Sequence, residues 1–254
     1  MNLVNKEYHK RAKTLLDNWQ DDRGDKKGFD LPEDETLPAL VELSLLAADA
    51  SISEVNKLCK IAREVSVASI CVNPSHVQRC VQVLGDAIPV GTVVGFPLGA
   101  NHTKIKIAEA ELAFAQGAKH LNVVINIGLL KTSNFQEVFE ELRSVRYACP
   151  DVDLTVILET ALLEPLQIII ASMLCREAGA DAVMTSTGLA NSGATQEDVS
   201  LLRSVLADDL DVVASGGIGS RESMVGLFEA GASRLTIEFS VEDDTLSGLI
   251  KHTD

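Results

Sequence analysis

The sequence has no excess of positive charge and no long apolar run. Its 254 residues carry 22 Lys and Arg against 37 Asp and Glu, which gives a formal net charge of -15. Nucleic acids are polyanions and no basic cluster offsets this charge, so we expect no nucleic-acid binding. No apolar run reaches the roughly 20 residues of a membrane span, and the first residues lack the apolar segment of a secretory signal. We therefore expect a cytoplasmic protein that does not bind membranes.

Cysteine and histidine are also scarce and scattered. The five cysteines form no CxxC pair and their number is odd, which argues against a disulfide framework. We expect most of them to be small buried residues. The five histidines share no metal-ligand spacing. We therefore predict neither a metal nor a cofactor.

The first 36 residues differ from the rest. KEYHKRAKTLLDNWQ can form an amphipathic helix, and the DDRGDKKGFDLPEDET that follows is polar and interrupted by Gly and Pro. We predict an N-terminal helical arm and linker over residues 1–36, with the arm covering a core or one end of the main domain. Residues 37–254 are predicted to form that domain.

Eight short runs rich in Val and Ile alternate with segments of helical period. The runs are ALVELSLL, ASICV, PVGTVVGF, HLNVVINI, DLTVILET, DAVMTS, DVVAS and SRLTIE. Such alternation is typical of βα units around a parallel sheet. Gly117, Gly179 and Gly231 each stand where a helix is expected to end, because glycine readily adopts the left-handed conformation of a helix terminus. Eight such units predict a single α/β (β/α)8 TIM barrel, with its site at the C-terminal strand ends.

Strand alternation predicts which side chains point into the barrel. This inward set is polar and contains no lysine: Glu42, Ser44, Cys71, Asn73, Asn122, Asn126, Glu159, Met184, Ser186, Val213, Ser215, Thr236 and Glu238. Met184 ends a strand just before a Thr-Ser-Thr-Gly turn, where a barrel enzyme presents a side chain to substrate. A thioether is a poor acid, a poor base and a weak nucleophile. The side chain at this strand end therefore cannot serve as a catalytic acid, base or strong nucleophile.

Six stretches together resemble the deoxyribose-phosphate aldolase family. They are CVNPSHV, VVGFPLGA, VVINIGLLK, ILETALL, TSTG followed by SGAT, and ASGGI, in the family's order and spacing, and the similarity runs from about residue 39 to about residue 238. The resemblance implies a TIM barrel and class I aldolase chemistry, in which a lysine forms a Schiff base with an aldehyde. It also implies a possible homodimer.

The resemblance places the family's catalytic positions on uncharged residues. The Schiff-base lysine falls on Met184, the lysine beside it on Val213, and the proton-relay aspartate on Asn122. Loss of the lysines favours loss of the aspartate, since a buried carboxylate without cationic neighbours costs several kcal/mol.

Phosphate recognition departs from the family pattern as well. Gly219 stands where the family has a basic residue, and Glu238 and Phe239 replace the small residues that would hold phosphate. The remaining candidates for ligand contact are turn residues: Thr185, Ser186, Gly188, Ser215, Gly216 and Gly217.

Three hypotheses follow. The first is a catalytically silent barrel with a binding, regulatory or scaffold role, whose small-molecule or protein partner is unidentified. The second is an enzyme of another reaction type, a lyase or cyclase, with Glu42, Glu159 or Glu238 as acid or base. The third, least favoured, is a deoxyribose-phosphate aldolase with a relocated lysine. Lys104, Lys106 and Lys131 are the lysines nearest the barrel mouth, and Lys106 and Lys131 are expected to be solvated.

Overall fold

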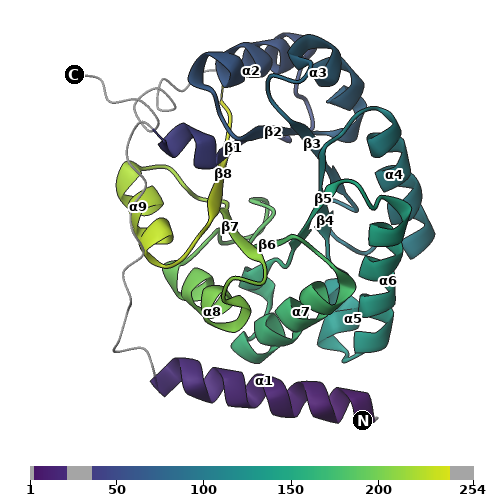
Figure 1. Cartoon of the computed structure of the whole chain (residues 1–254), viewed down its shortest axis with the longest axis vertical. Helices are drawn as coiled ribbons and strands as arrows, with labels where there is room; N and C mark the ends of the chain where they lie inside the picture. The colour runs from purple at the N-terminus through teal and green to yellow at the C-terminus, as the bar shows by residue number, and fades with distance from the viewer. Residues whose placement is uncertain (1–2, 22–35, 241–254) are drawn as a thin grey trace.

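The chain forms a closed barrel of eight parallel strands, and helical structure follows each of the first seven (Figure 1). This architecture comes from a computed structural model that describes residues 3–21 and 36–240. The strands pair in sequence order, and the last pairs with the first. The predicted (β/α)8 TIM barrel is therefore confirmed.

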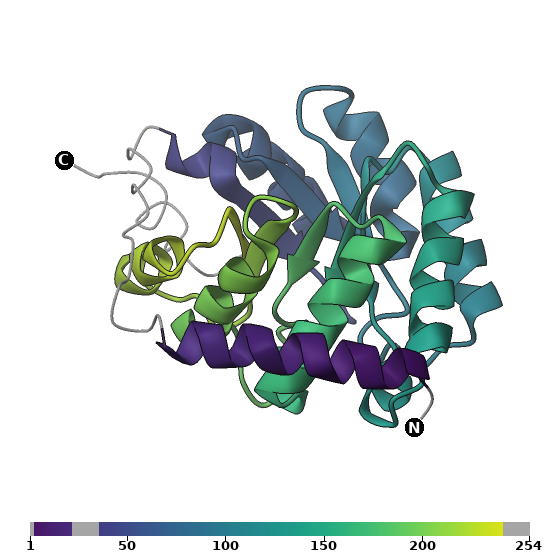
Figure 2. The ribbon, with the colours of Figure 1, turned by 60° about the horizontal axis from the view of Figure 1, so that its bottom comes forward.

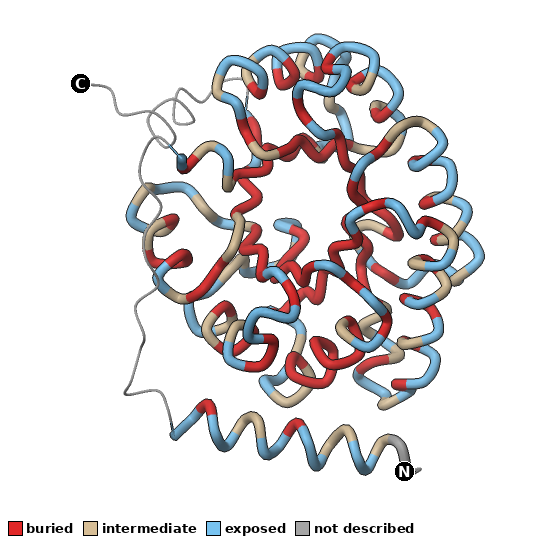
Figure 3. The backbone as a smooth tube through the Cα atoms, viewed as in Figure 1, coloured by how far each residue is buried: buried red, intermediate tan, exposed pale blue. Residues whose placement is uncertain are grey.

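The strands are short, rich in β-branched residues and almost wholly buried. Their inner faces pack inside the barrel and their outer faces pack against helices, as all-parallel sheets require. Figure 3 shows the strand residues as a ring of buried residues around the barrel axis. The strands are β1 (Val41–Leu45), β2 (Ser69–Val72), β3 (Val90–Val94), β4 (His120–Val124), β5 (Asp153–Ile157), β6 (Ala182–Met184), β7 (Asp211–Ser215) and β8 (Arg234–Glu238).

Helices surround the barrel and begin and end at sequence-encoded caps. Ser51 forms a capping box with Glu54 at the first of them, and Gly117, Gly179 and Gly231 have positive φ as predicted. The helices are α2 (Ile52–Val65), α3 (Val77–Leu84), α4 (Thr103–Ala115), α5 (Ile127–Lys131), α6 (Phe135–Ala148), α7 (Pro165–Ala178), α8 (Gln196–Leu206) and α9 (Arg221–Glu229), with short 3-10 turns η2 (Leu37–Leu40), η3 (Pro74–His76) and η4 (Thr160–Leu162).

The N-terminal helix α1 (Leu3–Asp21) lies along the side of the barrel, across α7 and α8 (Figure 2). Trp19 is 7% exposed, and its Nε1–H donates to Ser200 Oγ of α8 at 3.3 Å. The helix therefore packs on other helices and covers part of the hydrophobic core, as expected, and it does not cover a barrel end. The predicted linker falls mostly on residues 22–35, which lie outside the described residues, and the division at residue 36 stays a prediction.

Within the described residues, no helix combines the length and apolar character needed to cross a bilayer.

Candidate functional site

Met184 and Val213 lie inside the barrel in a small apolar cluster. They are 3% and 4% exposed, and they pack with Val124, Ile157 and Ala182, with Phe96 against the edge of the cluster. Strand pairing sets Met184 beside Val213, because β6 and β7 are in register there. Phe239 instead belongs to the main hydrophobic core. Met184 and Val213, on which the resemblance places the family's lysines, are therefore buried among other apolar side chains.

A polar network centred on Glu42 lies beside this cluster, toward the amino-terminal ends of the strands. His120 Nε2 is 2.5 Å from Glu42 Oε2, and Ser69 Oγ donates to the same oxygen at 3.1 Å. Asn122 Nδ2 and Thr236 Oγ1 donate to Glu42 Oε1 at 3.1 and 3.2 Å. One carboxylate thus connects side chains from four other strand positions.

A glycine makes room for the histidine of this network. Gly91 of β3 is paired with His120 of β4, and a Cβ on Gly91 would lie 1.9 Å from His120 Nε2. Beside the network is a cavity of about 10 Å³, lined in part by Met184, Val213 and Arg234. That volume is about the space of one water molecule. The barrel interior is therefore packed, with no room for a sugar at this level.

The network changes the acidity of its members. Burial alone would raise the pKa of Glu42, but the charge of His120 and hydrogen bonds from His120, Ser69 and Asn122 outweigh it and hold that pKa below its ordinary value. Burial, assisted by the charge of Glu42, raises the pKa of the Cys71 thiol well above its ordinary value. Cys71 therefore stays a neutral thiol, in agreement with a packing role, and it contacts Asn122 Nδ2 at 3.4 Å.

A larger cavity, of about 380 Å³, lies at the carboxyl ends of β1, β6, β7 and β8. Four of the residues predicted to contact a ligand line it: Gly188, Ser215, Gly216 and Gly217. Ser44, Thr187, Thr236 and Glu238 line it as well. Gly216 and Gly217 have φ of 87° and 71°, so the turn uses the left-handed conformation that glycine tolerates. Open space at the carboxyl ends of barrel strands is where such folds bind small molecules.

Two of the predicted contact residues do not line this cavity. Thr185 Oγ1 donates to Ser215 O at 3.1 Å and accepts from Ser215 N at 3.0 Å, which ties β6 to β7. Ser186 is fully buried, and its Oγ has no hydrogen-bond partner among the described residues. Asn73 and Asn126, predicted to point inward, stand instead at the N-termini of helical turns.

The three candidate carboxylates are not brought together. Glu42 lines the small cavity and Glu238 the large one, while Glu159 lines neither. Glu159 is 3% exposed and accepts a hydrogen bond from Thr187 Oγ1 at 2.5 Å, as expected for a carboxylate bound to neighbouring hydroxyls. Neither of these two cavities holds two of the carboxylates, so neither offers an acid and base pair.

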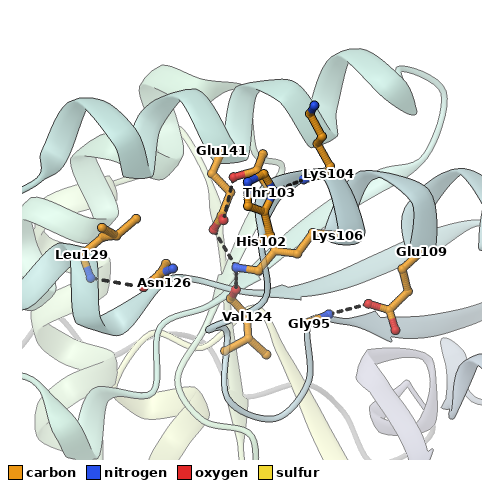
Figure 4. Close-up of polar contacts among 10 residues, drawn as sticks. All are labelled: Gly95, His102, Thr103, Lys104, Lys106, Glu109, Val124, Asn126, Leu129 and Glu141. Carbon is orange, nitrogen blue, oxygen red and sulfur yellow. Dashed lines mark hydrogen bonds and ion pairs between the residues drawn. The ribbon is translucent and has the colours of Figure 1, made fainter.

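Lys106 is fully buried, which contradicts the expectation of a solvated side chain. Its Nζ is 2.6 Å from Glu141 Oε1 and donates to Val124 O at 2.8 Å (Figure 4). Burial lowers the pKa of this lysine, while the Glu141 charge opposes that effect. Lys104 and Lys131 are exposed, and Lys131 Nζ donates to Leu162 O. None of the three lines either cavity.

No group of three or more His, Cys, Asp and Glu side chains within the described ranges is arranged to hold a metal ion.

The fold and the position of the larger cavity define an α/β barrel with an open cavity at the carboxyl ends of its strands. The chain belongs to the DeoC/LacD aldolase family: the model described as DeoC/LacD family aldolase matches residues 40–231.

Curated relatives agree with this assignment over most of their length. Deoxyribose-phosphate aldolase of Brevibacillus brevis is 43% identical over 77% of this chain and 89% of its own. The enzyme of the same name from Carboxydothermus hydrogenoformans is 41% identical over 86% of this chain and 97% of its own.

Solved structures agree as well. QR15, an aldolase, is 34% identical and superposes with a TM-score of 0.78 over 85% of this chain and 99% of its own. The tetrameric deoxyribose-phosphate aldolase of Aeropyrum pernix is 27% identical, with a TM-score of 0.76 over 88% of this chain and 92% of its own.

These relatives overturn the prediction of a catalytically silent barrel. Similarity of about 40% identity over most of the chain, to proteins that are deoxyribose-phosphate aldolases, supports an active aldolase. It equally favours an aldolase over the alternative of a different reaction type. The prediction weighed the loss of charge at three positions above the similarity of the rest of the barrel.

Sequence reasoning missed two features of the site. It overlooked Thr187, which connects the large cavity to Glu159, and the contact between His120 and Glu42. His120 stands two residues before Asn122, on the same face of a strand, so alternation was a usable signal. No comparable signal located the partner of Lys106.

Proposed function

We propose that this chain is an aldolase that cleaves or forms a carbon–carbon bond in a small hydroxylated aldehyde of the deoxyribose type. The observation that carries the proposal is the similarity to deoxyribose-phosphate aldolases over 77% to 86% of the chain. The cavity at the carboxyl ends of β1, β6, β7 and β8 supports it, since a volume of about 380 Å³ suits a small sugar.

In the cleavage direction the reaction moves one proton and one electron pair. A base takes the proton of the hydroxyl on the third carbon, whose oxygen forms a carbonyl as the bond to the second carbon breaks. The electron pair passes to the second carbon, which is then protonated. Acetaldehyde and a three-carbon aldehyde result, with no oxidant or reductant. The enzyme must supply a proton acceptor and a group that stabilises the negative charge.

We assign the proton acceptor to Glu159 acting through Thr187. Thr187 lines the large cavity, and its Oγ1 donates to Glu159 Oε2 at 2.5 Å, so a proton taken by this hydroxyl can pass to the carboxylate. Glu159→Gln should lower kcat about 100-fold, because general base catalysis contributes at least that factor. Thr187→Ser keeps the hydroxyl and should retain most of the activity. Equal losses in the two variants would contradict the relay.

The activity test measures acetaldehyde released by the purified protein from 2-deoxyribose and from 2-deoxyribose 5-phosphate, each supplied separately. Release from either sugar above a heat-inactivated control is expected. No release from both, under conditions in which an authentic deoxyribose-phosphate aldolase is active, would contradict the proposal.

Trapping during the same reaction identifies any lysine that forms a Schiff base with the substrate. Met184 and Val213 have no amine, so a Schiff base would have to form on a lysine elsewhere in the chain. Borohydride reduction during turnover, followed by peptide mapping, distinguishes Lys104, Lys106 and Lys131. Lys104→Met and Lys131→Met change exposed side chains and serve as matched variants. An adduct that disappears in one of them identifies the nucleophile.

A cytoplasmic location and a homodimer are part of the same proposal. The tetrameric relative from Aeropyrum pernix supports self-association, though not its stoichiometry here. Light scattering on the full chain gives the number of subunits directly.

A further inference from the structure

The larger cavity carries negative charge. Among the described residues that line it, Glu238 is the only one with a charged side chain, and Ser44, Ser215 and Thr236 contribute hydroxyls. The lining therefore offers a carboxylate and hydrogen-bonding groups, and the described part of the chain places no Lys or Arg in it.

Glu238 is fixed at this position by the strand that carries it. It is the last residue of β8, in register with Ser44 of β1. Strand alternation puts it on the same face as Thr236, which points into the barrel and bonds to Glu42. The side chain is exposed, and within the described residues no lysine or arginine forms an ion pair with it. Its charge is therefore not neutralised by a described neighbour.

The backbone donors of the same cavity do not require an anion. Gly216 and Gly217 line it, and amide groups exposed by such turns can donate to phosphate oxygens. The same amides can also donate to the oxygen of a sugar hydroxyl. A carboxylate discriminates between the two, because it accepts a hydrogen bond from a hydroxyl and repels a phosphate dianion.

We infer that the substrate end held in this cavity is an uncharged hydroxyl, so that the enzyme acts on a non-phosphorylated deoxy sugar or a similar polyhydroxy aldehyde. This inference rests on the proposed aldolase function for the identity of the reacting end. It differs from what the relatives' names state, since those enzymes act on deoxyribose-phosphate. Glu238 is the residue that would determine the difference.

Binding, measured by calorimetry at low salt, tests the inference without turnover. The wild-type protein should bind 2-deoxyribose more tightly than 2-deoxyribose 5-phosphate. Glu238→Gln removes the charge and keeps the shape, so it should raise the affinity for the phosphate on the order of tenfold. The affinity for 2-deoxyribose should stay within about threefold, because glutamine still accepts a hydrogen bond. Added salt should narrow the difference between wild type and variant.

The control is Glu222→Gln. Glu222 is an exposed carboxylate in the first turn of α9 and does not line the cavity. It should leave both affinities unchanged. A shift in phosphate affinity equal to that of Glu238→Gln would show a general effect of net charge and overturn the inference.

Other outcomes are equally decisive. Tighter binding of the phosphorylated sugar by the wild type, or binding of neither sugar, overturns the inference. If Glu238→Gln fails to fold, the test is whether inorganic phosphate competes with 2-deoxyribose for binding to the wild type. Effective competition would contradict the inference. If only the proposed function is wrong, the protein should release no acetaldehyde from either sugar but should still bind 2-deoxyribose more tightly than 2-deoxyribose 5-phosphate.

Discussion

At the scale of single residues, Glu42 shows how a buried charge is tolerated. Its two oxygens contact His120 and accept hydrogen bonds from Ser69, Asn122 and Thr236. A buried carboxylate with so many donors is stabilised in its ionised form. The amide at position 122 fits this arrangement, because Asn122 donates to Glu42 where an aspartate would repel it.

Replacing Glu42 should cost stability in a pH-dependent way. The pKa of Glu42 in the folded chain lies below its ordinary value of 4.5, so its contribution is fully present above pH 4.5 and is lost as the pH falls through the folded pKa. We expect Glu42→Gln to lower the free energy of unfolding by about 2 kcal/mol at pH 7. The deficit should shrink as the pH falls below 4.5. Urea unfolding at several pH values measures it.

The exposed Glu7 of α1 provides the control. Glu7→Gln should change the free energy of unfolding little at any pH. A deficit for Glu42→Gln that grows as the pH falls below 4.5 would contradict a lowered pKa of Glu42 in the folded chain.

The ion pair of Lys106 and Glu141 makes a second residue-level prediction. Both side chains are at most 2% exposed, so removing one partner leaves the other charge buried without its counter-ion. Lys106→Met should lower the free energy of unfolding by about 3 to 5 kcal/mol. The double variant Lys106→Met with Glu141→Leu should lose less than the sum of the single variants. Additive losses in this double-mutant cycle would show that the two charges are not coupled.

At the scale of elements, local sequence explains where helices begin and end. Ser51 accepts from Glu54 N, while the Glu54 side chain accepts from Ser51 N, which satisfies two amides at the start of α2. Gly117, Gly179 and Gly231 end helices because glycine adopts positive φ without strain. These features are local, and the sequence predicted the three glycine helix ends before any tertiary contact was known.

The cap of α2 can be tested separately. Ser51→Ala should lower the free energy of unfolding by about 1 kcal/mol, because one helix amide loses its acceptor. Ser51→Asp keeps an acceptor at the same place and should be nearly neutral. Thermal denaturation of the three proteins compares them. Equal losses in both variants would mean that packing at position 51, and not the cap, is responsible.

At the scale of the whole molecule, α1 is attached to the barrel through contacts with α7 and α8. Trp19 is the only tryptophan of the chain and is 7% exposed in this contact. Its fluorescence therefore reports whether α1 is docked. We expect the thermal transition seen by tryptophan fluorescence to coincide with that seen by far-ultraviolet circular dichroism, as for a single cooperative unit. A fluorescence transition several degrees lower would mean that α1 undocks before the barrel unfolds.

The sequence by itself determined the barrel and the chemical character of its catalytic positions. Eight apolar runs with alternating helical segments are a local, repeated signal, and Met184 and Val213 carry no amine in any fold. Family motifs located the turn residues Gly188, Ser215 and Gly216, which do line a cavity.

Only the tertiary structure decided which side chains meet. Glu42 and His120 are 78 positions apart, and Lys106 and Glu141 are 35 apart, so no periodicity links them. Closure of the barrel also separated Glu42, Glu159 and Glu238, which strand alternation alone had grouped together. The physical reason is that alternation fixes the face on which a side chain lies, whereas its depth and its partners depend on strand register and on the side chains packed across the barrel.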